Sequence, residues 1–132
     1  MNLMGYLLIA LGGAIGAVAR YAVGSAVHSR VTGSFPWGTF VINATGSFLL
    51  GLVNTLLAER FITNLAWRPL FTIGFVGAYT TFSTFEYESA KLGSSWQALG
   101  NLLGSVVAGY ACVWLGIFVA RWITTSHGHI QA

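Results

Sequence analysis

Polar side chains are scarce in this chain, and three of them are spaced so that they can act together. Thr39, Asn43 and Ser47 stand four residues apart inside an apolar stretch, and on a helix this spacing puts them on one face. A carboxamide in hydrocarbon is costly unless it finds a hydrogen-bond partner. The stripe therefore predicts either hydrogen bonds between helices or a polar path through a membrane, and the spacing alone favours the hydrogen bonds.

The segment at 74–85 is the most unusual part of the sequence, since two glycines are followed by a run of Thr, Ser and Phe. Glycine permits nonhelical angles, and the hydroxyls offer the backbone alternative hydrogen bonds, so a break in the helix is expected here. A broken helix at membrane depth occurs where its backbone is buried in protein or lines a cavity. Freed carbonyls can coordinate a cation, and a new helix N-terminus attracts an anion. The alternative is a packing kink whose hydroxyls bond back to the helix.

Two phenylalanines of this segment, Phe82 and Phe85, share a helix face and are interleaved with hydroxyl side chains. Such a pair often only packs against lipid or a neighbouring helix, but the positive edge of a ring can also approach an anion. A small hydrated anion needs donors that replace its water. Ring edges, hydroxyls and the Asn43 amide can do this and still release the ion. Arg20 can draw anions into a vestibule, or it can extend to lipid headgroups.

The composition indicates what kind of fold must position these groups. Of 132 residues, only 6 are Lys or Arg and 3 are Asp or Glu, so that 7% are charged while 55% are apolar. An ordinary soluble domain has about 25% charged residues and needs a polar shell. The balance excludes a free-standing soluble enzyme, a disordered tail and a disulfide-rich secreted module. It predicts an integral membrane protein.

Four stretches carry no charge, at residues 1–19, 31–58, 69–85 and 92–120, and each is close to or above the roughly 20 residues of a membrane span. Tryptophans at positions 37, 67, 96 and 122 fit the interfacial belt. We therefore expect one all-α domain over 1–132, with spans at 3–27, 37–58, 70–92 and 97–123. The first span is expected to be retained rather than cleaved as a signal peptide, because no positive charge precedes it.

The positive charges predict how these spans insert. With four spans, one side of the membrane holds Arg60, Arg68 and Arg121, and the other holds Arg20, Arg30 and Lys91. Orientation follows an excess of Lys and Arg on one side, and this chain has none. Insertion in both directions is therefore predicted, and two opposed copies can pair as an antiparallel, dual-topology homodimer.

Small residues recur at helical spacing and predict close helix contacts. They lie at Gly12 and Gly16, and again at Ser105, Gly109, Cys112 and Gly116. Small side chains let helix backbones approach each other in a membrane. Packing within one chain and a seam between two copies explain this pattern equally well.

Three motifs, at 12–21, 36–51 and 74–85, resemble those of the CrcB/Fluc fluoride channels, in the same order and across almost the whole chain. The resemblance implies a passive fluoride-selective channel in the bacterial plasma (inner) membrane. It further implies an antiparallel homodimer with two pores, through which a cell sheds fluoride. Its partners would be fluoride, a second copy of the chain and membrane lipid, with no nucleic acid.

The same resemblance implies individual roles. Asn43, Phe82 and Phe85 would contact fluoride in the pore, and the adjoining polar path would be lined by Ser83, Thr84, Glu88 and, on the last helix, Ser105. We expect Glu88 to face the path and Glu86 to face water or headgroups. The carbonyls of Gly77 and Thr80 would hold a central sodium ion shared by both subunits.

Two other functions compete with the channel. A small dual-topology proton-coupled multidrug or cation transporter needs an acidic residue deep in a span. The first, second and fourth apolar stretches contain none, and Glu86 and Glu88 lie toward one end of the third. A scaffold subunit would leave the polar and phenylalanine stripes as packing alone. No nucleophile, base or cofactor motif supports an enzyme.

Overall fold

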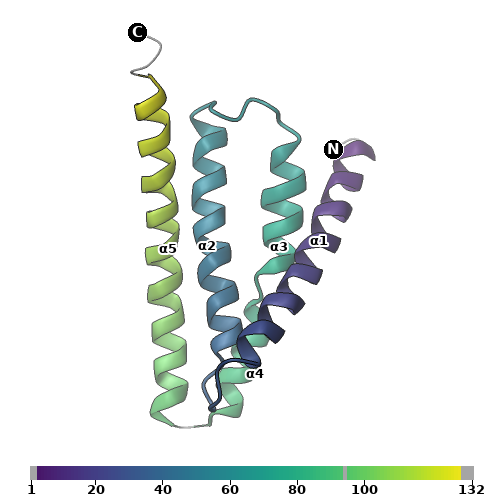
Figure 1. Ribbon diagram of the computed structural model, residues 1–132. Helices are drawn as coiled ribbons and strands as arrows, with labels where there is room; N and C mark the ends of the chain where they lie inside the picture. Colours follow the sequence, from purple (N-terminus) through teal and green to yellow (C-terminus); the bar gives the residue numbers. More distant parts are fainter. Residues whose placement is uncertain (1–2, 94, 129–132) are drawn as a thin grey trace.

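The computed structural model describes residues 3–93 and 95–128, which form helices and connecting segments only (Figure 1). The elements are, in chain order, α1 (Leu3–His28), α2 (Trp37–Ala58), the π-helical segment η1 (Arg68–Val76), α3 (Gly77–Tyr79), α4 (Phe82–Lys91) and α5 (Trp96–Gly128).

The chain runs from end to end of the molecule four times. The passes are α1, then α2, then η1 with α3 and α4, and finally α5 (Figure 1). The start of α1, the connection from α2 to η1 and the end of α5 lie at one end of the molecule. Three helices, α1, α2 and residues 96–126 of α5, are long and apolar enough to cross a membrane.

The helix ends differ from the expected spans by a few residues, except for α2, which matches 37–58. The third pass begins at Arg68 rather than at residue 70, and α5 continues to Gly128 rather than ending at residue 123. The expected limits followed the apolar stretch, whereas a helix can continue into the interface because all its backbone groups bond within the segment.

Two helix pairs form most of the packing, α2 with α5 and α1 with η1. Both depend on small residues. A Cβ atom at Gly12 would meet the backbone carbonyl of Leu70 on η1, and one at Gly116 would meet the carbonyl of Phe48 on α2. Glycine permits this close backbone approach. Helices in lipid are not driven together by the hydrophobic effect, so such close packing is what stabilises their contact. These two glycines of the small-residue pattern therefore serve contacts within one chain.

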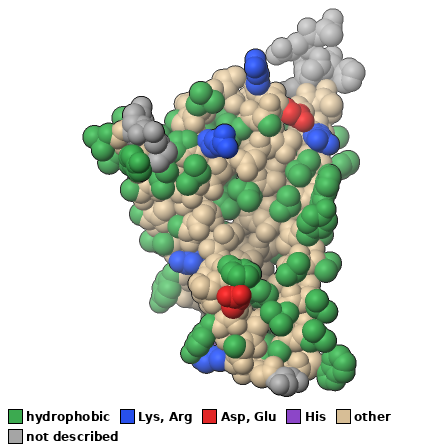
Figure 2. Space-filling view, turned by 180° about the vertical axis from the view of Figure 1, so that it is seen from behind, with side chains coloured by type: hydrophobic (Ala, Val, Ile, Leu, Met, Phe, Trp, Pro, Cys, Tyr) green, Lys and Arg blue, Asp and Glu red, His purple; other side chains and the backbone are tan. Residues whose placement is uncertain are grey.

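The outer surface of the molecule is apolar. On α5, large apolar side chains are exposed at Leu103, Val106, Val107, Tyr110 and Phe118. In Figure 2, green apolar side chains line the two edges of the view and are scattered over a largely tan centre, while the few blue and red charged side chains lie in its upper part and its lower half. Contact of such a surface with water is unfavourable in free energy. Lipid or another copy of the chain can cover it instead.

Candidate functional site

The third pass is interrupted between α3 and α4. The helix ends at Tyr79, Thr80 has an extended ψ of 156°, and Thr81 is extended with φ −149° and ψ 114°. The Thr81 hydroxyl then caps α4, since its Oγ1 accepts a hydrogen bond of 3.3 Å from the amide of Thr84. It also donates to the Thr84 hydroxyl at 2.9 Å. Of the two threonines that interrupt the helix, Thr81 therefore also caps the next one.

Asn43 of α2 pairs with the interrupted backbone. Its Nδ2 donates to the Thr81 carbonyl at 3.0 Å, and its Oδ1 accepts from the Thr81 amide at 2.8 Å. One side chain thus satisfies both backbone groups of a residue that has left the helix. The Thr81 amide is the usual helical donor to the Gly77 carbonyl, so this pairing also leaves that carbonyl without its helical partner.

A cavity of about 470 Å³, here called the phenylalanine cavity, lies between α2, the interruption and α5. Its lining includes Asn43, Thr80, Phe82, Phe85 and Ser105. The two phenylalanine rings lie 5.9 Å apart between centroids, but Phe82 is 69% exposed and Phe85 only 6%. One ring is therefore held in the protein, while the other stands at the open side.

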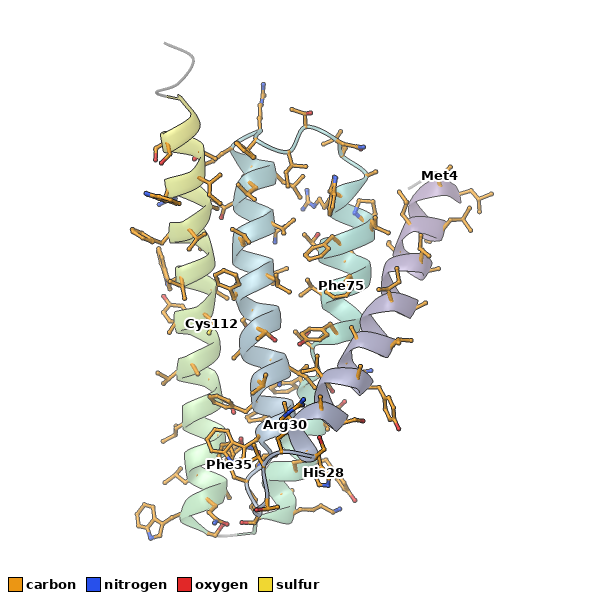
Figure 3. All side chains as sticks on the ribbon, in the orientation of Figure 1. Met4, His28, Arg30, Phe35, Phe75 and Cys112 are labelled. Atoms are coloured by element: carbon orange, nitrogen blue, oxygen red, sulfur yellow. The ribbon has the colours of Figure 1, made fainter. Side chains whose placement is uncertain are left out.

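A second cavity of about 410 Å³, the arginine cavity, lies between α1, α2 and α4. Its polar lining includes Arg20, His28, Thr39, Thr81 and Glu88. Figure 3 shows His28 at the end of the molecule where Phe35, also part of the lining, comes from the α1–α2 connection. Because Thr81 lines both cavities, they meet at the interruption.

The arginine cavity holds charges of both signs. Arg20 Nη1 donates to the carbonyl of Thr80 over 3.5 Å. Glu88 Oε2 is buried and accepts no hydrogen bond within the described part of the chain. Glu88 thus faces a cavity, whereas Glu86 is exposed.

The remaining predicted residues do not line either cavity. Ser83 and Thr84 are exposed on α4, and Thr84 is bonded to Thr81. Gly77 is exposed, and a Cβ atom there would meet nothing within 4 Å. The Gly77 carbonyl, whose usual helical donor is paired with Asn43, and the Thr80 carbonyl, which accepts from Arg20, are oxygen groups of the kind that a hard cation takes.

Thr81 belongs to the hydroxyl run at 74–85 that the sequence singled out, whereas two polar residues beside the site, Ser89 and Asn101, did not figure in the sequence-based prediction. Thr81 joins the two cavities, and on α5 the side chain of Asn101 is 1% exposed and bonded to Ser89 of α4. A signal for Asn101 was present, because it stands four residues before Ser105 in an apolar stretch. Ser89 follows Glu86 and Glu88, just beyond the third charge-free stretch, where nothing in the sequence distinguishes it from a surface serine.

The fold and the site define a small, multi-pass helical membrane protein whose polar groups meet at an interrupted helix. The chain belongs to the family described as CrcB-like protein, Camphor Resistance (CrcB), whose model matches residues 7–117.

Relatives support this assignment over nearly the whole length. A protein of Solibacter usitatus is 51% identical over 89% of this chain and 99% of the relative. A protein of Acidobacterium capsulatum is 48% identical over 91% and 98%, and one of Magnetococcus marinus is 46% identical over 87% and 96%. Each of these relatives bears the name fluoride-specific ion channel FluC. The bacterial relatives and the apolar helices identify a multi-pass protein of the bacterial inner membrane.

Proposed function

We propose that this chain forms a fluoride-selective channel that exports F⁻ passively down its electrochemical gradient and so protects a cell from fluoride. Family membership and the name shared by the relatives support this function. The observation that carries it in this chain is the phenylalanine cavity, where an amide and two phenylalanine rings adjoin the start of a helix.

The proposed path stabilises an anion with neutral groups. Asn43 Nδ2 has two hydrogens, and only one is used by the Thr81 carbonyl, so the second can donate to an ion. The first amides of α4 have no partner within the helix and lie at its positive end. Together with the ring edges of Phe82 and Phe85, these donors can replace part of the water of fluoride without a fixed positive charge.

The other polar residues would guide the ion beyond this point. Arg20 would attract fluoride into the arginine cavity, which we assign as a vestibule. Ser83, Thr84, Glu88 and Ser105 would continue the polar path. Ser83 and Thr84 are exposed on a single chain, so their part in a path requires a second surface to cover them.

An antiparallel homodimer with two pores would supply that surface. The equal numbers of Lys and Arg on the two sides support dual topology. The 69% exposure of Phe82 beside a cavity open on one side also supports a covering copy. In this arrangement η1, α3 and α4 form the third span, broken near the midplane at Thr80 and Thr81.

A sodium ion shared by the two copies fits the same interruption. The carbonyls of Gly77 and Thr80 would hold it, because the former has lost its helical donor to Asn43 and is exposed. Bound there, the cation would offset the partial negative charge of carbonyls from both chains.

Reconstitution into liposomes tests the proposed function. Purified protein in vesicles loaded with potassium fluoride should release fluoride when valinomycin provides a potassium shunt. Matched vesicles loaded with potassium chloride should release chloride far more slowly under the same gradient. The release should continue when protonophore and pH gradient are varied. Absence of fluoride release would refute the channel, and release strictly tied to proton exchange would favour a proton-coupled transporter.

A further inference from the structure

A chain of three hydrogen bonds connects α4 with the wall of the phenylalanine cavity on α5. Ser89 Oγ donates to the Phe85 carbonyl at 2.7 Å, and Asn101 Nδ2 donates to Ser89 Oγ at 2.7 Å. Ser105 Oγ then donates to Asn101 Oδ1 at 3.1 Å. Ser89 is 5% exposed and Asn101 is 1% exposed, so water cannot easily replace these partners.

The direction of this chain is set by its first member. A backbone carbonyl can only accept, so the single proton of Ser89 is committed to Phe85. Ser89 Oγ must then accept from Asn101, which places the amide nitrogen on that side. The amide oxygen consequently faces Ser105 and accepts its proton.

This direction has a consequence for the cavity. Ser105 lines the phenylalanine cavity beside Phe82 and Phe85, but its one hydroxyl proton points at Asn101. The hydroxyl therefore offers lone pairs to the cavity, and lone pairs repel an anion. To donate to fluoride, Ser105 must turn its proton away and leave the buried Asn101 oxygen unpaired, which is unfavourable.

We propose that Asn101 is a positioning residue that competes with fluoride for the Ser105 proton and thereby weakens the hold of the cavity on the ion. The inference rests on the proposed fluoride path and adds a determinant of affinity to it. A conduction site must bind an ion weakly enough to release it. The fixed hydrogen bond between Asn101 and Ser105 supplies such weakening without a charge and without contact between Asn101 and the ion.

The test measures fluoride release from liposomes against internal fluoride concentration, with the full-length protein. Asn101→Leu, which keeps the approximate volume and removes the acceptor, should free the Ser105 proton. The half-saturating fluoride concentration should then fall by about three- to tenfold, the equivalent of one ordinary hydrogen bond. In a Ser105→Ala background the same substitution should cause no further shift, because no proton remains to be freed.

A general structural role for Asn101 gives a different result. If Asn101→Leu shifts the half-saturating concentration equally in the parent and in the Ser105→Ala background, or does not shift it at all, the inference is wrong. Thr72→Val is the matched control, since Thr72 is also buried at 7% exposure and donates to the Arg68 carbonyl at 2.7 Å but lines neither cavity. It should leave the half-saturating concentration unchanged.

Ser89→Ala provides a second route if Asn101→Leu does not assemble. It leaves Asn101 free to turn its nitrogen toward Ser105, so the half-saturating concentration should fall here too, and only when Ser105 is present. A shift that persists in the Ser105→Ala background, or none, would refute the inference. A parent protein that releases no fluoride would refute the proposed function itself, whereas a conducting parent with unshifted variants would refute only the role of Asn101.

Discussion

At the scale of single residues, Asn43 has the most consequential contacts of the site. The sequence left open whether this amide joins helices or lines a path. It makes two hydrogen bonds to the Thr81 backbone and also lines the phenylalanine cavity. The two interpretations are therefore compatible, because an amide has more hydrogen-bonding capacity than one backbone residue uses.

Replacement of Asn43 by Ala should lower stability as well as fluoride flux. Two hydrogen bonds are lost and two backbone groups are left unpaired, so we expect a loss of about 1–3 kcal/mol, measured by thermal unfolding in detergent. Asn54→Ala is the control, because Asn54 is an exposed amide on the same helix. Equal melting temperatures for the two variants would contradict the role of Asn43 at the interruption.

Phe82→Ile tests the ring edge separately from packing. Phe82 is 69% exposed in a single chain, so this change should leave folding intact, while fluoride release falls about three- to tenfold through loss of the aromatic contact. Flux is measured in liposomes after the elution volume of the purified protein is checked. A correctly assembled variant with unaltered flux would remove Phe82 from the proposed path.

At the scale of elements, the sequence predicted the features that depend on composition and periodicity, namely the helices and the irregular third pass. Charge-free stretches located the helices, and the Gly, Thr and Ser content of 74–85 indicated an irregular third pass. The position of the interruption at Thr80 and Thr81 was not predictable, because it depends on Asn43, which is remote in sequence. Nor was the buried pair of Asn101 with Ser89, since it requires α4 and α5 to be in contact.

Gly16 tests the contact between α1 and η1. A Cβ atom there would meet the Phe75 carbonyl, so Gly16→Leu should overpack the seam and lower stability by at least about 1–3 kcal/mol, measured by thermal unfolding. At Gly104 of α5 a Cβ atom meets nothing within 4 Å, so Gly104→Leu is the matched control. Equal melting temperatures for both variants and the parent would contradict the role of Gly16 in this contact.

At the scale of the whole molecule, dual topology can be tested through charge. Two double variants would each bias insertion toward one orientation, and the two orientations are opposite: Val31→Lys with Thr32→Lys, and Thr63→Lys with Leu65→Lys. The four residues are exposed and lie in connections at opposite ends of the molecule. Each double variant alone should lose fluoride release by more than about tenfold, and coexpression should restore it.

Thr32→Lys combined with Thr63→Lys in one chain is the control, because it adds equal charge to both ends. This protein should remain active alone. Full activity of each biased variant by itself, with its single orientation verified by cysteine labelling, would contradict the antiparallel dimer.

The central claim is passive, fluoride-selective conduction, and the reversal potential in a planar bilayer tests it most directly. One chamber would hold about ten times more sodium fluoride than the other, with sodium chloride added so that sodium and total anion are equal on both sides. Passive conduction of fluoride predicts a current that reverses near the fluoride equilibrium potential, about 59 mV for a tenfold gradient of a singly charged ion, at equal or unequal pH. A reversal near zero, or one that follows the pH gradient, would contradict it.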